Sequence, residues 1–169
     1  MNPVCVLIGP PGSGKSSVGR ALAVELATTF KDTDEVIEAQ AGKTIAEIFI
    51  EDGEPFFRDL EVQTVAEAIA QHDGVLALGG GAVMRSETAQ ALSDQTVVFL
   101  DVSLPHATKR VGMSANRPLL LGNVRSKMKT MLDERRPVYE SLAKITINTD
   151  EKTVAEVASE IAAALKVQR

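Results

Sequence analysis

The chain has 169 residues, of which 44% are hydrophobic and 24% are charged, a composition typical of one ordinary globular domain. Its formal net charge of −5 argues against a general nucleic-acid binder, and no apolar run approaches the roughly 20 residues that cross a bilayer. Because an apolar run begins at Val4 with no signal or transit peptide before it, and Cys5 is the single cysteine, we expect a cytoplasmic protein without disulfides.

The first expected element is a buried strand, Val4–Ile8, followed by G-P-P-G-S-G-K-S at residues 9–16 and a helical pattern from Ser16 to Leu26. This is the phosphate-binding motif G-x-x-x-x-G-K-S in the strand–loop–helix setting that its chemistry requires. The N–H groups of such a loop and the positive end of the helix hold phosphate oxygens. We therefore expect a bound nucleoside triphosphate, with Lys15 at its β- and γ-phosphates and Ser16 at Mg²⁺.

Two carboxylates follow in Asp32-Thr33-Asp34, at the end of a short strand expected near Phe30–Thr33. In an extended segment, residues two apart point to the same side. One carboxylate can then hold the water shell of Mg²⁺ while the other orients an acceptor hydroxyl and takes its proton. An acidic turn without function is the alternative for this pattern alone.

Three glycines, Gly79-Gly80-Gly81, follow the expected strand Val75–Leu78. Successive glycines let the backbone approach a ligand closely and offer N–H donors without side-chain obstruction, although a tight turn needs glycine as well. Many phosphate-loop proteins carry a metal-binding aspartate at the end of this strand, so glycine here leaves the metal to Asp32.

Further strands are expected at Thr96–Asp101 and Lys144–Asn148, with helical patterns between them. In the last helix, Thr153 is the expected N-cap, and the apolar residues on one face are Val154, Val157, Ala158, Ile161 and Leu165. Strands that alternate with helices predict an α/β protein: three αβα layers around a parallel sheet of about five strands. Ligands of such sheets bind at the carboxyl ends of the strands.

Basic residues are concentrated late in the chain: the segment Lys109–Lys152 holds ten of the 18 Lys and Arg but five of the 23 Asp and Glu. This distribution favours a local anionic ligand. Within it, residues 112–124 are expected to form a mobile lid, in which Arg117 stabilises charge on a transferring phosphoryl group. Arg58 and Arg135 are candidates for gripping an anionic acceptor, because an arginine fork binds a carboxylate in two places.

Six motifs in order resemble those of the shikimate kinases, small kinases related in fold to the nucleoside monophosphate kinases. The resemblance covers essentially the whole chain, which makes residues 1–169 one phosphate-loop kinase domain. The motifs are G-P-P-G-S-G-K-S at 9–16, D-T-D at 32–34, G-E-P-F-F-R at 53–58, G-G-G-A at 79–82, R-P-L-L at 117–120 and R-R-P-V-Y at 135–139.

The resemblance implies an ATP- and Mg²⁺-dependent transfer of a phosphoryl group to the 3-hydroxyl of shikimate, with Lys15, Asp34 and Arg117 as catalytic residues. It implies that the nucleotide contacts Gly12, Ser13, Gly14, Lys15, Ser16, Ser17, Arg110, Arg117 and Lys152. It implies that the metal is held by Ser16 and Asp32. It implies that shikimate lies in a helical region around residues 34–61 and contacts Asp34, Phe49, Phe57, Arg58, Glu61, Gly79, Gly80, Gly81 and Arg135.

One choice of residue and one departure qualify the match to the family. Arg135 and Arg136 are adjacent, and the pattern R-x-P-x-Y selects Arg135 because it stands two residues before Pro137. The expected adenine loop, residues 148–153, lacks the proline that many relatives carry.

The alternatives to this function are a related kinase for gluconate or a nucleoside monophosphate, and a nucleotide-binding regulatory module without kinase activity. The family also suggests a monomer, with no nucleic-acid or membrane partner.

Overall fold

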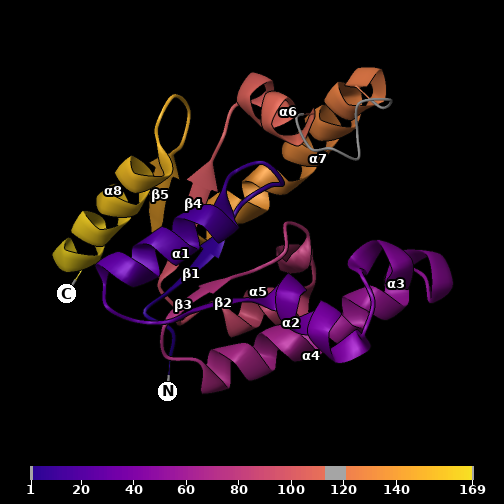
Figure 1. Ribbon diagram of the computed structural model, residues 1–169, viewed down its shortest axis with the longest axis horizontal. Helices are drawn as coiled ribbons and strands as arrows, with labels where there is room; N and C mark the ends of the chain where they lie inside the picture. The colour runs from indigo at the N-terminus through magenta and orange to yellow at the C-terminus, as the bar shows by residue number, and fades with distance from the viewer. Residues whose placement is uncertain (1, 113–120, 169) are drawn as a thin grey trace.

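The computed structural model of the chain describes residues 2–112 and 121–168, and Figure 1 shows their arrangement around a central sheet. The five strands lie in the order β2-β3-β1-β4-β5, and all neighbours are parallel. Their bounds are β1 Cys5–Ile8, β2 Phe30–Asp32, β3 Val75–Ala77, β4 Val97–Asp101 and β5 Ile145–Asn148. The predicted parallel α/β sheet is confirmed.

Helices cover both faces of the sheet. Their bounds are α1 Lys15–Glu25, α2 Thr33–Ala41, α3 Ile45–Glu51, α4 Glu54–Gln71, the 3₁₀ helix η1 Ala82–Met84, α5 Ser86–Ala91, α6 Leu104–Gly112, α7 Leu121–Leu142 and α8 Val154–Val167. One face packs on α1 and α8, through residues such as Leu22 and Ile161. The opposite face packs on α4, η1, α5 and α7, through residues such as Val65 and Tyr139.

The local patterns in the sequence translate directly into these elements. Each expected strand agrees with the observed one to within a residue at either end. In α8, Thr153 accepts a hydrogen bond from the N–H of Glu156, whose carboxylate accepts one from the N–H of Thr153. This reciprocal cap begins the helix, and the apolar face behind it supplies the burial that stabilises it.

The topology opens a crevice beside the central strand. β1 and β3 are neighbours, but the chain after β1 enters α1 on one face, whereas the chain after β3 enters η1 and α5 on the other. Loops that leave neighbouring strands toward opposite faces separate at the carboxyl edge, which is where ligands of such sheets bind. Here those two loops are residues 9–14 and 79–81.

Two satellite clusters stand on either side of this crevice. Ile37, Ile48 and Phe57 form one between α2, α3 and α4, and Val102, Ala107 and Met128 belong to the other between α6 and α7. In Figure 1 the two helical groups project beyond the sheet with the loop after β1 between them.

Among the described residues, no helix has the length and hydropathy needed to span a membrane.

The segment expected to be a lid overlaps both helical ends. Gly112 is the last residue of α6 and α7 begins at Leu121, so the expected range of approximately 112–124 includes one residue of α6 and the first turn of α7. Residues 113–120, including Arg117, lie outside the described part of the chain.

Candidate active site

The phosphate loop joins β1 to α1 in a conformation that depends on glycine. Gly14 is the N-cap of α1 and has a φ of 89°. Because glycine has no side chain that could cap the helix, the first N–H groups of α1 can donate to a ligand. The ammonium group of Lys15 donates to the carbonyl oxygens of Gly9 at 2.7 Å and Pro10 at 3.1 Å. Burial lowers the pKa of Lys15 to about 8, against the opposing effect of the nearby Asp34 and Asp32 carboxylates.

Ser16 and Asp32 meet next to this loop. The Ser16 hydroxyl donates to Oδ2 of Asp32 at 2.6 Å, and Oδ1 of Asp32 accepts the N–H of Asp34 at 2.8 Å. A hydroxyl and a carboxylate in contact beside a phosphate loop are the hard oxygen ligands that Mg²⁺ takes together with phosphate oxygens. The two residues therefore fit the expected metal.

The expectation that Asp32-Thr33-Asp34 is extended throughout is wrong. Asp32 ends β2 and is the N-cap of α2, so Asp34 lies in the first turn of a helix. An aspartate N-cap binds the N–H two residues on, and acidic residues in the first turn interact favourably with the helix dipole. The two side chains still reach one pocket because the helix begins at the sheet edge.

Asp34 faces the glycine loop with a free oxygen. Its Oδ1 is buried and has no hydrogen-bond partner among the described residues, as is true of Oε2 of Glu61. A Cβ atom on Gly79 would lie 2.7 Å from the first oxygen and 2.8 Å from the second, so both approach this glycine closely. Burial, with the charges of Asp32 and Glu61, raises the pKa of Asp34 to about 6.

A pocket of about 420 Å³ lies between α2–α4, the glycine loop and α7. Its lining residues are Pro11, Asp34, Ile45, Phe49, Glu54, Phe57, Arg58, Glu61, Gly79, Gly80, Gly81, Met131 and Arg135. We call it the acceptor pocket. All nine residues that the sequence assigns to shikimate line it.

Charged and apolar groups occupy separate parts of the acceptor pocket. The Arg58 guanidinium donates to Glu61 at 2.8 Å, and its Nη2 would lie 2.7 Å from a Cβ atom on Gly81. Phe49 and Phe57 meet edge to face with ring centroids 5.1 Å apart. The pocket thus offers guanidinium groups to an anion and aromatic surface to a carbon ring.

Arg135 and Arg136 lie in different surroundings. Arg135 lines the acceptor pocket, with Nη1 placed 3.2 Å from where a Cβ of Gly80 would be. Arg136 forms an ion pair with Asp101 at the end of β4 and donates to the carbonyl of Val102 at 3.3 Å. Only Arg135 of the two lines the acceptor pocket.

The acceptor pocket adjoins a second cavity over the phosphate loop. The lining of this phosphate pocket is Pro11, Gly12, Gly14, Lys15, Ser16, Ser17, Asp32, Asp34, Leu78, Gly79 and Gly80. Pro11, Asp34, Gly79 and Gly80 line both pockets. Asp34 therefore stands at the boundary between an anion cradle and a pocket for a second molecule.

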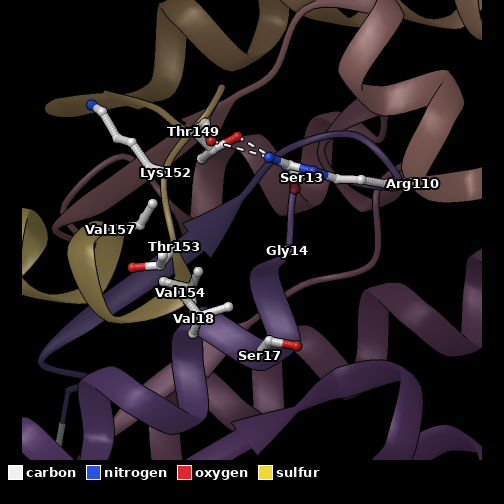
Figure 2. A pocket seen from close by; sticks show the side chains of 10 residues that line it. All are labelled: Ser13, Gly14, Ser17, Val18, Arg110, Thr149, Lys152, Thr153, Val154 and Val157. Atoms are coloured by element: carbon white, nitrogen blue, oxygen red, sulfur yellow. Dashed lines mark hydrogen bonds between the residues drawn. The ribbon is translucent and has the colours of Figure 1, made fainter.

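A third cavity, which Figure 2 shows, continues from the phosphate loop toward α8. Arg110 crosses it and donates to the carbonyl of Gly12 at 2.9 Å, to Oγ1 of Thr149 at 3.1 Å and to the Thr149 carbonyl at 3.0 Å. Val18, Val154 and Val157 give it an apolar wall. Such a cavity suits the base and ribose of a nucleotide whose phosphates lie in the loop.

Lys152 also lines this cavity, but its ammonium group is engaged elsewhere. It donates to both carboxylate oxygens of Glu160, at 3.0 and 3.1 Å, and in Figure 2 the side chain extends away from Arg110 and Thr149.

Sequence reasoning missed three residues that shape these pockets. Pro11 lines both the phosphate and the acceptor pocket, and Thr149 accepts a hydrogen bond from Arg110. The Tyr139 hydroxyl donates to the carbonyl of Gly80 at 2.6 Å. All three lie inside segments that the sequence singles out: Pro11 and Tyr139 in the family motifs, and Thr149 in the expected adenine loop.

Comparison with known sequences gives one consistent result. A sequence profile described as shikimate kinase matches residues 11–166. The chain is 54% identical to a shikimate kinase of Salinispora arenicola, over 98% of this chain and 99% of that protein. It is 53% identical to one of Thermobifida fusca, over 95% of this chain and 93% of that protein.

Solved structures agree with the sequence relatives. The shikimate kinase of Acinetobacter baumannii in complex with shikimate superposes with a TM-score of 0.92 at 33% identity, covering 100% of this chain and 95% of that one. A gluconokinase of Sinorhizobium meliloti superposes over 97% of this chain and 91% of that one, with a TM-score of 0.60 at 21% identity, which shows a shared fold alone. With its phosphate loop, adjoining acceptor pocket and close relatives, the chain belongs to the shikimate kinase family.

Proposed function

We propose that this protein transfers the γ-phosphoryl group of ATP to the 3-hydroxyl of shikimate, giving 3-phosphoshikimate and ADP. The observation that carries the proposal is the boundary shared by the phosphate and acceptor pockets, where Asp34 lines both. A kinase needs this arrangement because the acceptor hydroxyl must meet the γ-phosphorus in line.

The acceptor pocket supports a polyhydroxylated ring acid as the second substrate. Arg58 and Arg135 supply two guanidinium forks for its carboxylate, and the glycine loop supplies N–H donors. Phe49 and Phe57 cover the ring, while Asp34 receives its hydroxyl groups. Glu61 fixes the Arg58 guanidinium through its 2.8 Å hydrogen bond and so acts on substrate through that arginine.

In the proposed reaction the 3-hydroxyl oxygen attacks the γ-phosphorus as the bond to the β–γ bridging oxygen breaks. Asp34 orients the hydroxyl and accepts its proton, and ADP leaves with the bridging oxygen. Lys15 and the N–H groups of residues 12–17 neutralise the charge that develops on the phosphates. Mg²⁺ held by Ser16 and Asp32 would supply further neutralisation of the β- and γ-phosphates.

Other assignments rest more heavily on the family. Arg117 is proposed to contact the transferring phosphoryl group, on the resemblance alone. Arg110 is proposed to lie against the adenine, which its position between Gly12 and Thr149 supports. Lys152 is proposed as part of the wall of the base cavity.

A coupled assay for ADP release tests the proposal. Purified protein with ATP and Mg²⁺ is given shikimate, gluconate or a nucleoside monophosphate, with an acceptor-free reaction as control. We expect fast ADP release when shikimate is the acceptor, and no more than the acceptor-free rate with gluconate or a nucleoside monophosphate. Release with gluconate alone would assign the acceptor pocket to another acid, and ATP binding with no acceptor-dependent release would make the protein a regulatory module.

We also propose that the protein works as a monomer on small molecules, without a nucleic-acid or membrane partner. The residues named for both substrates come from one chain. Light scattering during size-exclusion chromatography measures the mass directly, and a mass near 18 kDa is expected.

A further inference from the structure

The glycine loop after β3 turns its carbonyl groups into the protein. The carbonyl of Gly79 accepts the N–H of Ala82 at 3.1 Å, and that of Gly81 accepts the N–H of Met84 at 3.1 Å. These two bonds are local and belong to the turn that starts η1. The middle carbonyl, that of Gly80, accepts instead from a side chain 59 residues away, the Tyr139 hydroxyl at 2.6 Å.

Tyr139 is itself held rigidly. Its side chain is 1% exposed, and its ring stacks on Phe99 of β4 with centroids 5.0 Å apart. Burial raises the pKa of Tyr139 to about 12, so the hydroxyl keeps its proton at any working pH. A buried, stacked phenol has little freedom to follow the loop, and its hydrogen bond therefore fixes the loop to the sheet and α7.

The same helix carries the carboxylate-binding arginine. Arg135 precedes Tyr139 by four residues, so the two side chains lie one turn apart on the same side of α7. Gly80 lies between them and the phosphate loop: a Cβ atom there would meet Nη1 of Arg135 at 3.2 Å and Cδ of Pro11 at 3.1 Å. The Tyr139 bond thus sets where Gly80 stands relative to both Arg135 and the phosphate loop.

We propose that Tyr139 is a positioning residue for the acceptor: its hydroxyl holds the Gly80 carbonyl so that the glycine loop and Arg135 keep the spacing that binds the acceptor acid. The inference rests on the proposed function and deepens it, since it adds a residue that touches no substrate. Tyr139 acts through Gly80, which lines both pockets, and its larger effect falls on the acceptor pocket, where Gly80 stands against Arg135.

Tyr139→Phe tests this because it removes only the hydroxyl and keeps the stacking on Phe99. The KM for shikimate should rise roughly tenfold, since small displacements of binding groups are costly, while the KM for ATP stays within about twofold. Leu92→Val is the matched control, because Leu92 is buried in the same core cluster and lines neither the acceptor pocket nor the phosphate pocket. The control should lower thermal stability and leave both KM values unchanged.

Hydrogen–deuterium exchange of the substrate-free protein tests the hydrogen bond between Tyr139 and Gly80 independently of catalysis. Amides of residues 79–84 should exchange about tenfold faster in Tyr139→Phe and at the wild-type rate in Leu92→Val. If exchange there is unchanged, or if both variants shift the two KM values alike, the positioning role is overturned. Should wild-type protein release no ADP with shikimate, the proposed function fails while the exchange result still decides whether Tyr139 holds the loop.

Discussion

Arg135 and Arg136 are neighbours in the chain, yet Arg135 lines the acceptor pocket while Arg136 is paired with Asp101 at the end of β4. Adjacent positions on a helix are about 100° apart, so one helix can serve a binding site and a structural contact with consecutive arginines. The doubled arginine in the sequence therefore reflects two separate requirements.

Replacing each arginine with alanine separates these requirements. Arg135→Ala should raise the KM for shikimate by tenfold or more, because a hydrogen bond to a charged group contributes about 1.5–3 kcal/mol. Arg136→Ala should leave that KM within about twofold and lower the melting temperature instead, since it releases Asp101. Steady-state kinetics and thermal melts measure both, and the opposite order of KM values would assign the carboxylate to Arg136.

Asp34→Asn should reduce kcat to near background while ATP still binds. Asparagine keeps the shape of the side chain and loses the proton-accepting oxygen at the boundary of the two pockets. Turnover is measured by coupled ADP release and nucleotide binding by calorimetry. A kcat close to that of the wild type would remove Asp34 from its proposed role.

The same substitution should stabilise the protein at alkaline pH. Burial raises the pKa of Asp34 from 3.8 to about 6, so the native state binds this proton more tightly than the unfolded state. Stability therefore falls as pH rises from about 4 to 6, and the cost of the buried charge stays fully present above that range. Asp34→Asn should raise the free energy of unfolding by about 3 kcal/mol at pH 8, since the shift is roughly two pKa units and each unit corresponds to about 1.4 kcal/mol.

Urea denaturation at pH 8 and pH 3.5 measures this difference. At the lower pH the wild-type carboxyl is protonated, and the two proteins should unfold at similar urea concentrations. Equal stabilities at pH 8 would show that the charge on Asp34 is not costly in the folded protein.

Gly79→Ala should lower kcat/KM for shikimate by about 100-fold or more. The added Cβ would lie 2.7 Å from Asp34 and 2.8 Å from Glu61, which forces both carboxylates to move. Gly42→Ala is a useful control, because its φ is 70° but nothing lies within 4 Å of the added atom. That control should cost about 1–2 kcal/mol of stability through backbone strain and leave kcat/KM unchanged.

Arg110→Ala should raise the KM for ATP about tenfold and leave the KM for shikimate unchanged. The substitution removes three hydrogen bonds that tie the phosphate loop to Thr149 across the base cavity. Lys152→Ala, on the same cavity, should change either KM by less than about threefold, since Glu160 already occupies its ammonium group. A large effect of the lysine on ATP would show that it leaves Glu160 when nucleotide binds.

The elements predicted from the sequence are those whose causes are local. Buried strands appear as short apolar runs, α8 carries its own cap at Thr153, and the phosphate loop is one continuous motif. The extended conformation expected for Asp34 is wrong. Aspartate is a favoured N-cap residue, and Asp32 begins a helix that contains Asp34.

Contacts between distant segments could not be predicted in this way. The partners of Tyr139 and Arg136 lie 59 and 35 residues away, and the packing of α7 against the sheet decides which groups meet. The family motifs still identified Arg135 because they record such packing indirectly. The position of Arg135 in a family motif was therefore enough to assign it to the acceptor pocket. The hydrogen-bond partners of Tyr139 and Arg136 became known only from the three-dimensional structure.

The contact of Lys15 with the carbonyls of its own loop has a consequence for nucleotide affinity. The Lys15 ammonium group donates to these carbonyl oxygens, although the phosphate oxygens of ATP need the same donors. When ATP binds, hydrogen bonds to phosphate therefore replace hydrogen bonds that the protein already has. With a pKa of about 8 before binding, Lys15 gains a proton when the more negative triphosphate arrives at alkaline pH. We therefore expect nucleotide binding to be linked to proton uptake: affinity should weaken as pH rises above 8, and the calorimetric heat should depend on the ionisation enthalpy of the buffer.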